Sequence, residues 1–276
     1  MALNKLQKKV GRIKNSVVNK VIRLSYYCNS ILYLFFSSKF VAKYQEMAKG
    51  ESSMAIKQIN PLLEYFQSYT EGNGIWKWEH YFDIYHRHFQ KFIGRDVNVL
   101  EIGVFSGGSL EMWRNYFGEK SHIYGVDIEQ ACTTYQNEYT SIFIGDQQDP
   151  LFWQNFRKQA DEIDILIDDG GHTTEQQLTT LKEMLPYLRP GGVYLCEDVT
   201  GNSNKFAAFA AGLVNELNQI SLIPGSLLQS SLTSFQSSIY AIHFYPYVVV
   251  IEKNEVQASK FLCPRHGTNW QPFTFK

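Results

Sequence analysis

The sequence predicts an α/β protein with a doubly wound, mostly parallel seven-stranded sheet, a closing antiparallel hairpin and a helical N-terminal arm. Two observations carry this prediction. From residue 96 onward, short apolar segments alternate with stretches of helical length, which is typical of βαβ units. Near the C-terminus two apolar segments are joined only by Tyr245-Pro246-Tyr247, as in a hairpin. We divide the chain into an arm, a helical lead-in, an α/β domain and a tail, residues 1–45, 46–95, 96–253 and 254–276.

The expected strands are short apolar runs, residues 97–102, 122–127, 140–146, 164–169, 192–198, 239–243 and 248–252. Between the first two of them, a helix is expected to begin at Ser109 and to cover Leu110 to Tyr116. A serine at that position can cap the first turn of a helix, so we expect Ser109 to act as the cap.

Composition excludes several classes of protein. The 276 residues are 44% hydrophobic and 19% charged, which argues against collagen-like, low-complexity and disordered chains. The four cysteines form no CxxC pair, so the pattern argues against a disulfide framework or a zinc site and favours a reducing, cytoplasmic location.

Charge is divided unevenly along the chain. Residues 1–45 hold nine Lys or Arg and no acidic residue, which leaves 17 basic and 27 acidic residues in the remainder, a net charge of about −10. An acidic body argues against nucleic acid as a partner.

The arm itself has the apolar spacing of a basic amphipathic helix, from Leu6 to Leu24. Only 15 residues separate Arg23 from Lys39, too few for a comfortable membrane span, and no signal-peptide cleavage site follows. Two interpretations remain: the arm lies on an anionic membrane surface, at the inner face of the membrane, or it packs on the body or on another subunit of a homo-oligomer.

Acidic residues end each of the five predicted parallel strands: Glu101, Asp127, Asp146, Asp168 with Asp169, and Glu197 with Asp198. One such acid is often a helix cap. Five in succession indicate a site, because ligands of open parallel sheets bind beyond the carboxyl ends of the strands.

The run Asp168-Asp169-Gly170-Gly171-His172, together with Glu197-Asp198, predicts a metal site. Three carboxylates from two adjacent strand ends can surround one hard divalent cation such as Mg²⁺, which prefers oxygen ligands. His172 follows one short turn later, beside the cation, where an imidazole is suited to take a proton from a hydroxyl. Asp168 has two open roles: it orients His172, or it caps the following helix.

The first turn, E-x-G-x-x-x-G-G-S over residues 101–109, resembles the first motif of S-adenosylmethionine methyltransferases. It departs from GxGxxG, which argues against a dinucleotide site. In this interpretation the glycines, among them Gly103 and Gly107, admit the cofactor. Asp127 accepts hydrogen bonds from the ribose, and Asp146 with Gln147 meets the adenine amino group. The Rossmann-like sheet with its hairpin is likewise the arrangement of class I methyltransferases.

Longer motifs sharpen this resemblance. Four of them resemble the metal-dependent macrolide-sugar O-methyltransferases of the mycinamicin type. They are I-D-D-G-G-H-T at 167–173, Q-x-x-T-L-x-x-x-L-P-x-L at 177–188, R-P-G-G-V-Y-L-C-E-D at 189–198 and the aromatic lead-in W-K-W-E-H-Y-F-D-I-Y at 76–85. Cephalosporin-hydroxylase-like proteins and rhamnosyl O-methyltransferases share much of the pattern, which covers residues 76–253.

The resemblance implies S-adenosylmethionine and Mg²⁺ as cofactors and a hydroxyl of a sugar or glycosylated small molecule as acceptor. It implies metal ligands at Asp169, Glu197 and Asp198, with His172 as general base. It implies a cofactor site at Glu101, Gly103, Asp127 and Asp146, to which the turn adds Gly107 and Ser109 and the end of the third strand adds Gln147.

Other readings stay open. A metal-dependent hydroxylase or hydrolase could use the same acids and His172, and a non-catalytic cofactor-binding protein would keep the glycine turn. The aromatic lead-in also has two readings, sugar stacking or core packing under the first helix, for Trp76, Trp78, His80, Tyr81 and Tyr85.

Overall fold

The computed structural model describes residues 36–41, 43–44, 59–200, 204–222, 229–264 and 266–267. The chain divides into two units, residues 1–58 and 59–276, and each is considered by itself. In the first unit the described residues are helical. The amphipathic helix predicted from Leu6 to Leu24 lies outside the described residues.

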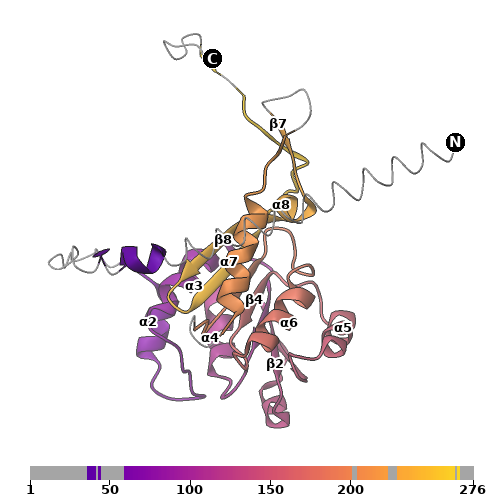
Figure 1. Cartoon of the computed structure of the whole chain (residues 1–276). Helices are drawn as coiled ribbons and strands as arrows, with labels where there is room; N and C mark the ends of the chain where they lie inside the picture. Colours follow the sequence, from indigo (N-terminus) through magenta and orange to yellow (C-terminus); the bar gives the residue numbers. More distant parts are fainter. Residues whose placement is uncertain are drawn as a thin grey trace. The chain divides into compact units, whose positions relative to one another are not determined.

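A sheet forms the centre of the second unit, with helices around it (Figure 1). It has seven strands in the order β3-β2-β1-β4-β5-β9-β8. The five strands from β3 to β5 are parallel, whereas β9 and β8 run antiparallel as the closing hairpin. The predicted fold is therefore confirmed. The strands are β1 Asn98–Ile102, β2 His122–Asp127, β3 Thr140–Ile144, β4 Ile165–Asp168, β5 Val193–Cys196, β8 Ile239–Tyr245 and β9 Val248–Lys253.

Helices cover both faces of this sheet, because neighbouring strand residues point to opposite sides. Val99 packs into a core with the helices of the lead-in and α4, while Leu100 packs into a second core with α5, α6 and α7. The helices are α2 Pro61–Ser68, α3 Tyr81–Phe89, α4 Gly108–Phe117, α5 Pro150–Gln159, α6 Thr174–Met184, α7 Phe206–Leu217 and α8 Ser234–Ser238.

Shorter elements complete the described part of this unit. Two 3₁₀ turns, η1 Gln90–Phe92 and η2 Gln130–Tyr135, follow α3 and β2. Three further strands form a separate small antiparallel sheet, β6 Ser221–Leu222, β7 Gln229–Ser231 and β10 Lys260–Leu262. No helix in the described part of the chain has the length and apolar character that a bilayer crossing requires.

Local sequence signals explain where the helices begin. Asp149 accepts a hydrogen bond from the Leu151 amide at the start of α5, and Pro150 occupies the first turn, where no amide donor is needed. Thr173 and Gln176 form a reciprocal capping box at the start of α6.

The expected start of α4 needs a correction. The helix begins at Gly108, and Gly107 precedes it in the left-handed conformation with φ of 76°. Ser109 therefore lies inside the first turn and does not cap it. Its hydroxyl instead donates to Glu101 at 2.6 Å, which ties the helix to the end of β1.

Candidate active site

A cavity of about 860 Å³ opens where the parallel strands end. Most of the sequence-predicted site residues line it, namely Gly103, Ser109, Asp127, Asp146, Gln147, Asp169, His172, Glu197 and Asp198. Glu101 and Gly107 are not among the lining residues. The convergence expected from parallel strand ends is thus present, since the predicted residues that line the cavity follow β1, β2, β3, β4 and β5. The lead-in before α3 supplies a further wall, including Trp76, Lys77 and Trp78.

The glycines of the first turn bring loops of the protein together. A Cβ on Gly103, whose φ is +89°, would lie 2.1 Å from the backbone carbonyl oxygen of Asp169. A Cβ on Gly108 would lie 2.2 Å from the carbonyl oxygen of Asn73, and one on Gly107 would meet the ring of Tyr135 at 2.8 Å. The sequence interpretation assigned these glycines to ligand approach, but the contacts show that loop–loop packing already requires them.

Asp127 ends β2 at the cavity wall, held by the two neighbouring loops. One of its carboxylate oxygens accepts from the Phe105 amide at 3.0 Å, and the other accepts from the Glu129 amide at 2.9 Å. Each oxygen keeps a further lone pair, so this carboxylate is oriented and can accept two more hydrogen bonds from a ligand.

Gln147 is buried, and its side-chain amide is engaged within the protein. Its Nε2 donates to Asp168 at 3.0 Å and to the Thr180 hydroxyl at 3.2 Å, while its Oε1 accepts from the Gly171 amide at 2.7 Å. Gln147 thus joins the loop after β3 to the loop after β4. Asp146 beside it accepts from the Gln148 amide at 2.8 Å.

Asp168 takes neither of the two roles left open by the sequence. Its carboxylate accepts from Gln147 and from the Tyr194 hydroxyl at 3.1 Å, and Thr173 caps the following helix. The carboxylate is fully buried, and this burial raises the pKa of Asp168 to about 6 despite the hydrogen bonds that it accepts. Asp168 therefore does not line the cavity and instead ties Gln147 and Tyr194 together within the protein.

Lys77 is a site residue that the sequence reasoning missed. Its ammonium nitrogen lies 2.6 Å from Asp169, 3.2 Å from Glu197 and 3.3 Å from Glu101, and its side chain is 3% exposed. The only signal in the sequence was its place in the aromatic lead-in, W-K-W-E-H-Y, which lies 92 residues before Asp169.

The charged groups of this cluster shift the pKa values of Lys77 and Glu197. Burial alone would lower the pKa of Lys77, but the carboxylates of Glu197, Asp169 and Glu101 leave it well above its usual value. Burial raises the pKa of Glu197, and Asp169 raises it further, while Lys77 opposes both effects. Lys77 is consequently a fixed cation at neutral pH, and it opposes the rise that burial causes in the pKa values of Glu101 and Glu197.

Two tyrosines of α3 hold the acids that follow β5. The Tyr85 hydroxyl donates to Oε1 of Glu197 at 2.7 Å, and the Tyr81 hydroxyl donates to Oδ1 of Asp198 at 2.7 Å. Both rings are buried, so the core-packing interpretation holds for them. Tyr81 also lines the cavity, but Trp76 and Trp78 differ from it because 86% and 56% of their surface is exposed.

His172 lies between two of the predicted metal ligands. Its Nε2 is 3.8 Å from Oδ1 of Asp169 and 3.6 Å from Oδ2 of Asp198. These three ligating atoms lie within 4.8 Å of one another, a spacing that one metal ion could bridge. The Glu197 carboxylate does not join this group, because its oxygens face Lys77 and Tyr85.

The backbone at His172 and Asp198 is strained. Their φ angles are 55° and 51°, in the left-handed region that residues other than glycine seldom occupy. The carbonyl oxygen of His172 accepts from the side chain of Asn204 at 2.9 Å, which helps to hold this conformation. Strain of this kind is concentrated at functional sites.

Comparison with protein families gives a match at this part of the chain. Residues 100–199, from β1 to the residue after Asp198, match the family described as a methyltransferase domain. The match therefore contains the strand ends that line the cavity.

Among curated proteins, the chain is similar to several that are named as O-methyltransferases. Demethylmacrocin O-methyltransferase of Streptomyces fradiae is 38% identical over 42% of this chain and 30% of its own length. Mycinamicin VI 2''-O-methyltransferase of Micromonospora griseorubida is 37% identical over 42% of this chain and 30% of its own length. A tetracenomycin-C rhamnosyl 3'-O-methyltransferase of Streptomyces olivaceus is 29% identical over 70% of this chain and 54% of its own length. The matches thus span about a third to a half of these relatives.

Solved structures show the same likeness. The MycE methyltransferase from the mycinamycin biosynthetic pathway, in complex with Mg and SAH, superposes with a TM-score of 0.58 at 26% identity, over 72% of this chain and 55% of that one. Its complex that also contains mycinamycin VI gives 0.57 at 27% identity, over 71% and 53%. Residues 100–199 of this chain therefore match a methyltransferase domain, its second unit has the fold of the MycE methyltransferase, and the curated proteins it is similar to are named as O-methyltransferases.

Proposed function

We propose that this protein transfers a methyl group from S-adenosylmethionine to a hydroxyl of a sugar or glycosylated small molecule, with Mg²⁺ as a second cofactor. The observation that carries the proposal is the single cavity in which Asp127, the carboxylates after β4 and β5, and His172 meet. The similar enzymes methylate sugar hydroxyls, and the MycE structures contain Mg and SAH.

For the methyl donor, we propose that Asp127 receives the two ribose hydroxyls. Its oxygens are oriented by backbone amides and keep lone pairs toward the cavity. We assign the methionine end to the turn after β1, near Gly103 and Ser109, and the adenine to the neighbourhood of Asp146. Because the Gln147 amide is already bonded within the protein, we assign it a supporting role in holding this wall.

For the metal, we propose Asp169 and Asp198 as ligands, with Glu197 as a third ligand once its carboxylate turns from Lys77 and Tyr85 toward the ion. The fit rests on free oxygens of Asp169 and Asp198 that face a common space beside His172. When bound there, a divalent ion would polarise an acceptor hydroxyl and favour its ionisation. Lys77 holds the other oxygen of Asp169, and Tyr81 holds the other oxygen of Asp198, so each carboxylate presents one oxygen.

For the proton, we propose that His172 accepts it from the attacking hydroxyl. Nε2 of His172 faces the carboxylates and the ring lines the cavity. A positioned base of this kind typically contributes about 10²–10⁴-fold to the rate. Alignment of the acceptor oxygen with the methyl carbon and the sulfur falls to the surrounding walls.

For the acceptor, we propose that its sugar ring binds against an aromatic rim formed by Trp76, Trp78 and Phe105. These side chains line the cavity yet are 86%, 56% and 71% exposed, so a bound ring could cover them. Indole faces suit the apolar faces of sugar rings, while the neighbouring carboxylates suit vicinal hydroxyls.

The test is incubation of the protein with labelled S-adenosylmethionine and a panel of glycosides that carry vicinal diols, with and without Mg²⁺. We expect label in a glycoside only when Mg²⁺ is present. Activity that survives EDTA would contradict the metal proposal, and binding of NAD in place of S-adenosylmethionine would contradict the cofactor proposal.

Variants separate the proposed roles. Asp127→Ala should weaken S-adenosylmethionine binding strongly in calorimetry. Asp169→Ala, Glu197→Ala or Asp198→Ala should abolish activity, so that added Mg²⁺ no longer changes the rate. His172→Ala should retain Mg²⁺ and cofactor binding but turn over slowly, with a residual rate that rises with pH as hydroxide replaces the base. Loss of Mg²⁺ binding in His172→Ala would make the histidine a ligand.

For the arm, we propose a binding role outside catalysis, with the two interpretations that its sequence allows. Its basic and apolar residues suit the surface of an anionic membrane. The same apolar stripe suits packing within a homo-oligomer.

A further inference from the structure

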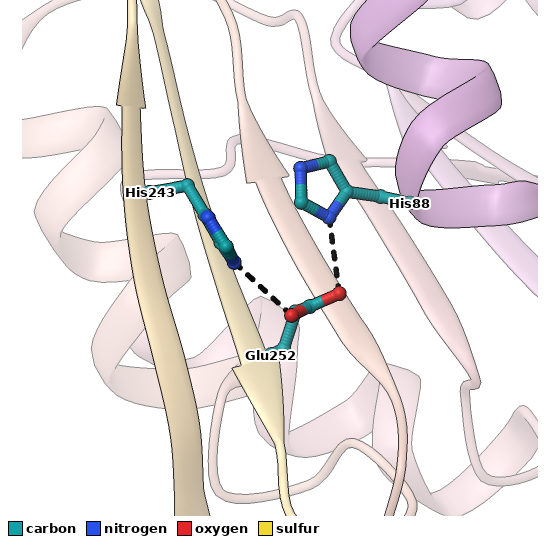
Figure 2. A group of neighbouring side chains, drawn as sticks. All are labelled: His88, His243 and Glu252. Carbon is teal, nitrogen blue, oxygen red and sulfur yellow. Dashed lines mark hydrogen bonds and ion pairs between the residues drawn. The ribbon is translucent and has the colours of Figure 1, made fainter.

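A second group of ligating side chains lies away from the cavity. His88 on α3, His243 on β8 and Glu252 on β9 point toward one another, with Glu252 between the two rings (Figure 2). Glu252 pairs with Val193, the first residue of β5, whereas the acids of the cavity follow Cys196, its last residue. The group therefore lies at the opposite end of β5 from the candidate active site.

The distances within this group suit three ligands of one ion. Nδ1 of His88 lies 3.0 Å from Oε1 of Glu252, and Nε2 of His243 lies 3.1 Å from Oε2. All three ligating atoms lie within 4.8 Å of one another. Zinc binds nitrogen and oxygen tetrahedrally at about 2.0–2.2 Å, so adjacent ligands around it are about 3.3–3.6 Å apart, and the two hydrogen-bonded pairs need to open by only a few tenths of an ångström to admit the ion.

A neighbouring residue, Tyr245, orients the imidazole of His88 and lies near that of His243. The Tyr245 hydroxyl hydrogen-bonds Nε2 of His88 at 2.9 Å, which leaves Nδ1 directed at Glu252. The Tyr245 ring also stacks on His243, with an interplanar angle of 17° and centroids 6.3 Å apart. Metal-binding histidines commonly have such a partner on the second nitrogen, because it fixes the ring and its tautomer.

The group is buried on one side and open on the other. The His88 side chain is 3% exposed, whereas those of Glu252 and His243 are 16% and 35% exposed. An ion can therefore enter from the side of His243, and a water molecule can complete its coordination there.

We propose that His88, His243 and Glu252 bind one divalent transition-metal ion of the zinc type. Two imidazoles and one carboxylate suit zinc and its neighbours, whereas Mg²⁺ favours oxygen ligands alone. The ion joins the C-terminal half of α3 to the closing hairpin. The N-terminal half of α3 carries Tyr81 and Tyr85, so the same helix reaches the acids of the cavity. Cysteine spacing, which argued against zinc, could not reveal a site without cysteine.

The first test counts zinc in the full-length protein. The protein is stripped with EDTA, incubated with Zn²⁺, desalted and analysed for zinc per chain by mass spectrometry. We expect His243→Asn and Glu252→Gln each to retain one ion per chain fewer than the unaltered protein. His86→Asn is the matched control on the same helix, because His86 bonds Tyr116 instead of this group, and it should retain the full number. Equal zinc in the unaltered protein and both cluster variants would overturn the proposal.

A second measurement leaves the three residues unaltered. The double variant Asp169→Asn, Asp198→Asn removes the carboxylates of the other ligating group, and X-ray absorption then reports the ligands of the zinc that remains. We expect two imidazoles with oxygen and no sulfur. A protein that retains no zinc, or a spectrum with sulfur or without imidazole, would overturn the proposal. Because this variant is expected to be inactive, its zinc content is judged independently of the proposed methyl transfer.

Discussion

The ammonium group of Lys77 lies within 3.3 Å of carboxylates at the ends of three strands, β1, β4 and β5. Several acids at one strand edge repel one another when buried, and the cost is greatest where water is excluded. Lys77 offsets that repulsion and also directs Asp169, whose other oxygen faces His172. At this scale, the candidate site depends on a cation that comes from outside the strands.

Replacing Lys77 with Met should destabilise the fold by about 3–5 kcal/mol at neutral pH, because the buried carboxyl groups of Glu101 and Glu197 and the partly buried one of Asp169 lose their cation. The loss should shrink as the pH falls, since protonation removes the repulsion and burial already raises the pKa of Glu197. Urea denaturation at several pH values measures both effects.

Lys158→Met is the matched control for this variant. Lys158 is exposed on α5, so its replacement should change the free energy of unfolding by no more than about 0.5 kcal/mol. Equal losses in the two variants, or a loss for Lys77→Met that grows in acid, would contradict the electrostatic role.

Cys132 offers a pH-dependent probe beside the cavity. Burial and the nearby Asp127 raise the pKa of its thiol to about 11. Alkylation requires the thiolate, so iodoacetamide should label Cys132 about tenfold faster for each added pH unit up to that value. Peptide mass spectrometry checks this, with exposed Cys263 as the internal reference. Rapid labelling of Cys132 at pH 8 would contradict the assignment.

At the scale of elements, the loops at the carboxyl edge of the sheet contact one another closely. The turn after β1 touches the loop after β4 at Gly103, and Gln147 joins the loop after β3 to the same segment. The lead-in contacts the start of α4 at Gly108. Strand ends alone would not place side chains this closely, so these contacts position Asp127 and Asp169 against one cavity.

Gly103→Ala should therefore lower the free energy of unfolding by more than the backbone strain of an alanine in the left-handed conformation alone. Strain at a positive φ costs about 1–3 kcal/mol, and forcing a methyl group into a filled space adds about 1–3 kcal/mol. Gly94→Ala is the matched control, because Gly94 has a φ of +74° but nothing within 4 Å of its added Cβ. Denaturant unfolding should show the larger loss for Gly103→Ala, and equal losses would contradict the close packing.

For the whole molecule, the sheet, both hydrophobic cores and the cavity lie within residues 59–276. The basic residues of positions 1–45 belong to the other unit, whereas the remainder of the chain has a net charge of the opposite sign. A segment with basic charge and an apolar stripe is suited to contact with a surface.

Deleting residues 1–58 should leave a protein that unfolds cooperatively and binds S-adenosylmethionine, as circular dichroism and calorimetry would show. If the arm lies on a membrane, the full-length chain should sediment with anionic liposomes, and the truncated chain should not. The attraction is about 1 kcal/mol per basic residue near the surface, so added salt should weaken it. Equal binding to neutral liposomes, or insolubility of the truncated chain, would favour packing or oligomerisation.

The sequence by itself determined the sheet, its hairpin and the edge that carries the site. Strand periodicity and a strand-end acid are local features, and parallel strands must bring their carboxyl ends to one edge. Asp127, Asp169 and Asp198 were therefore predictable. Only the tertiary structure decided which atoms meet at that edge. Lys77 reaches Glu197 from 120 residues away, and His88 reaches Glu252 from 164 residues away. Glu197 faces Lys77 whereas its neighbour Asp198 faces His172, because side-chain direction depends on packed neighbours that no local pattern records.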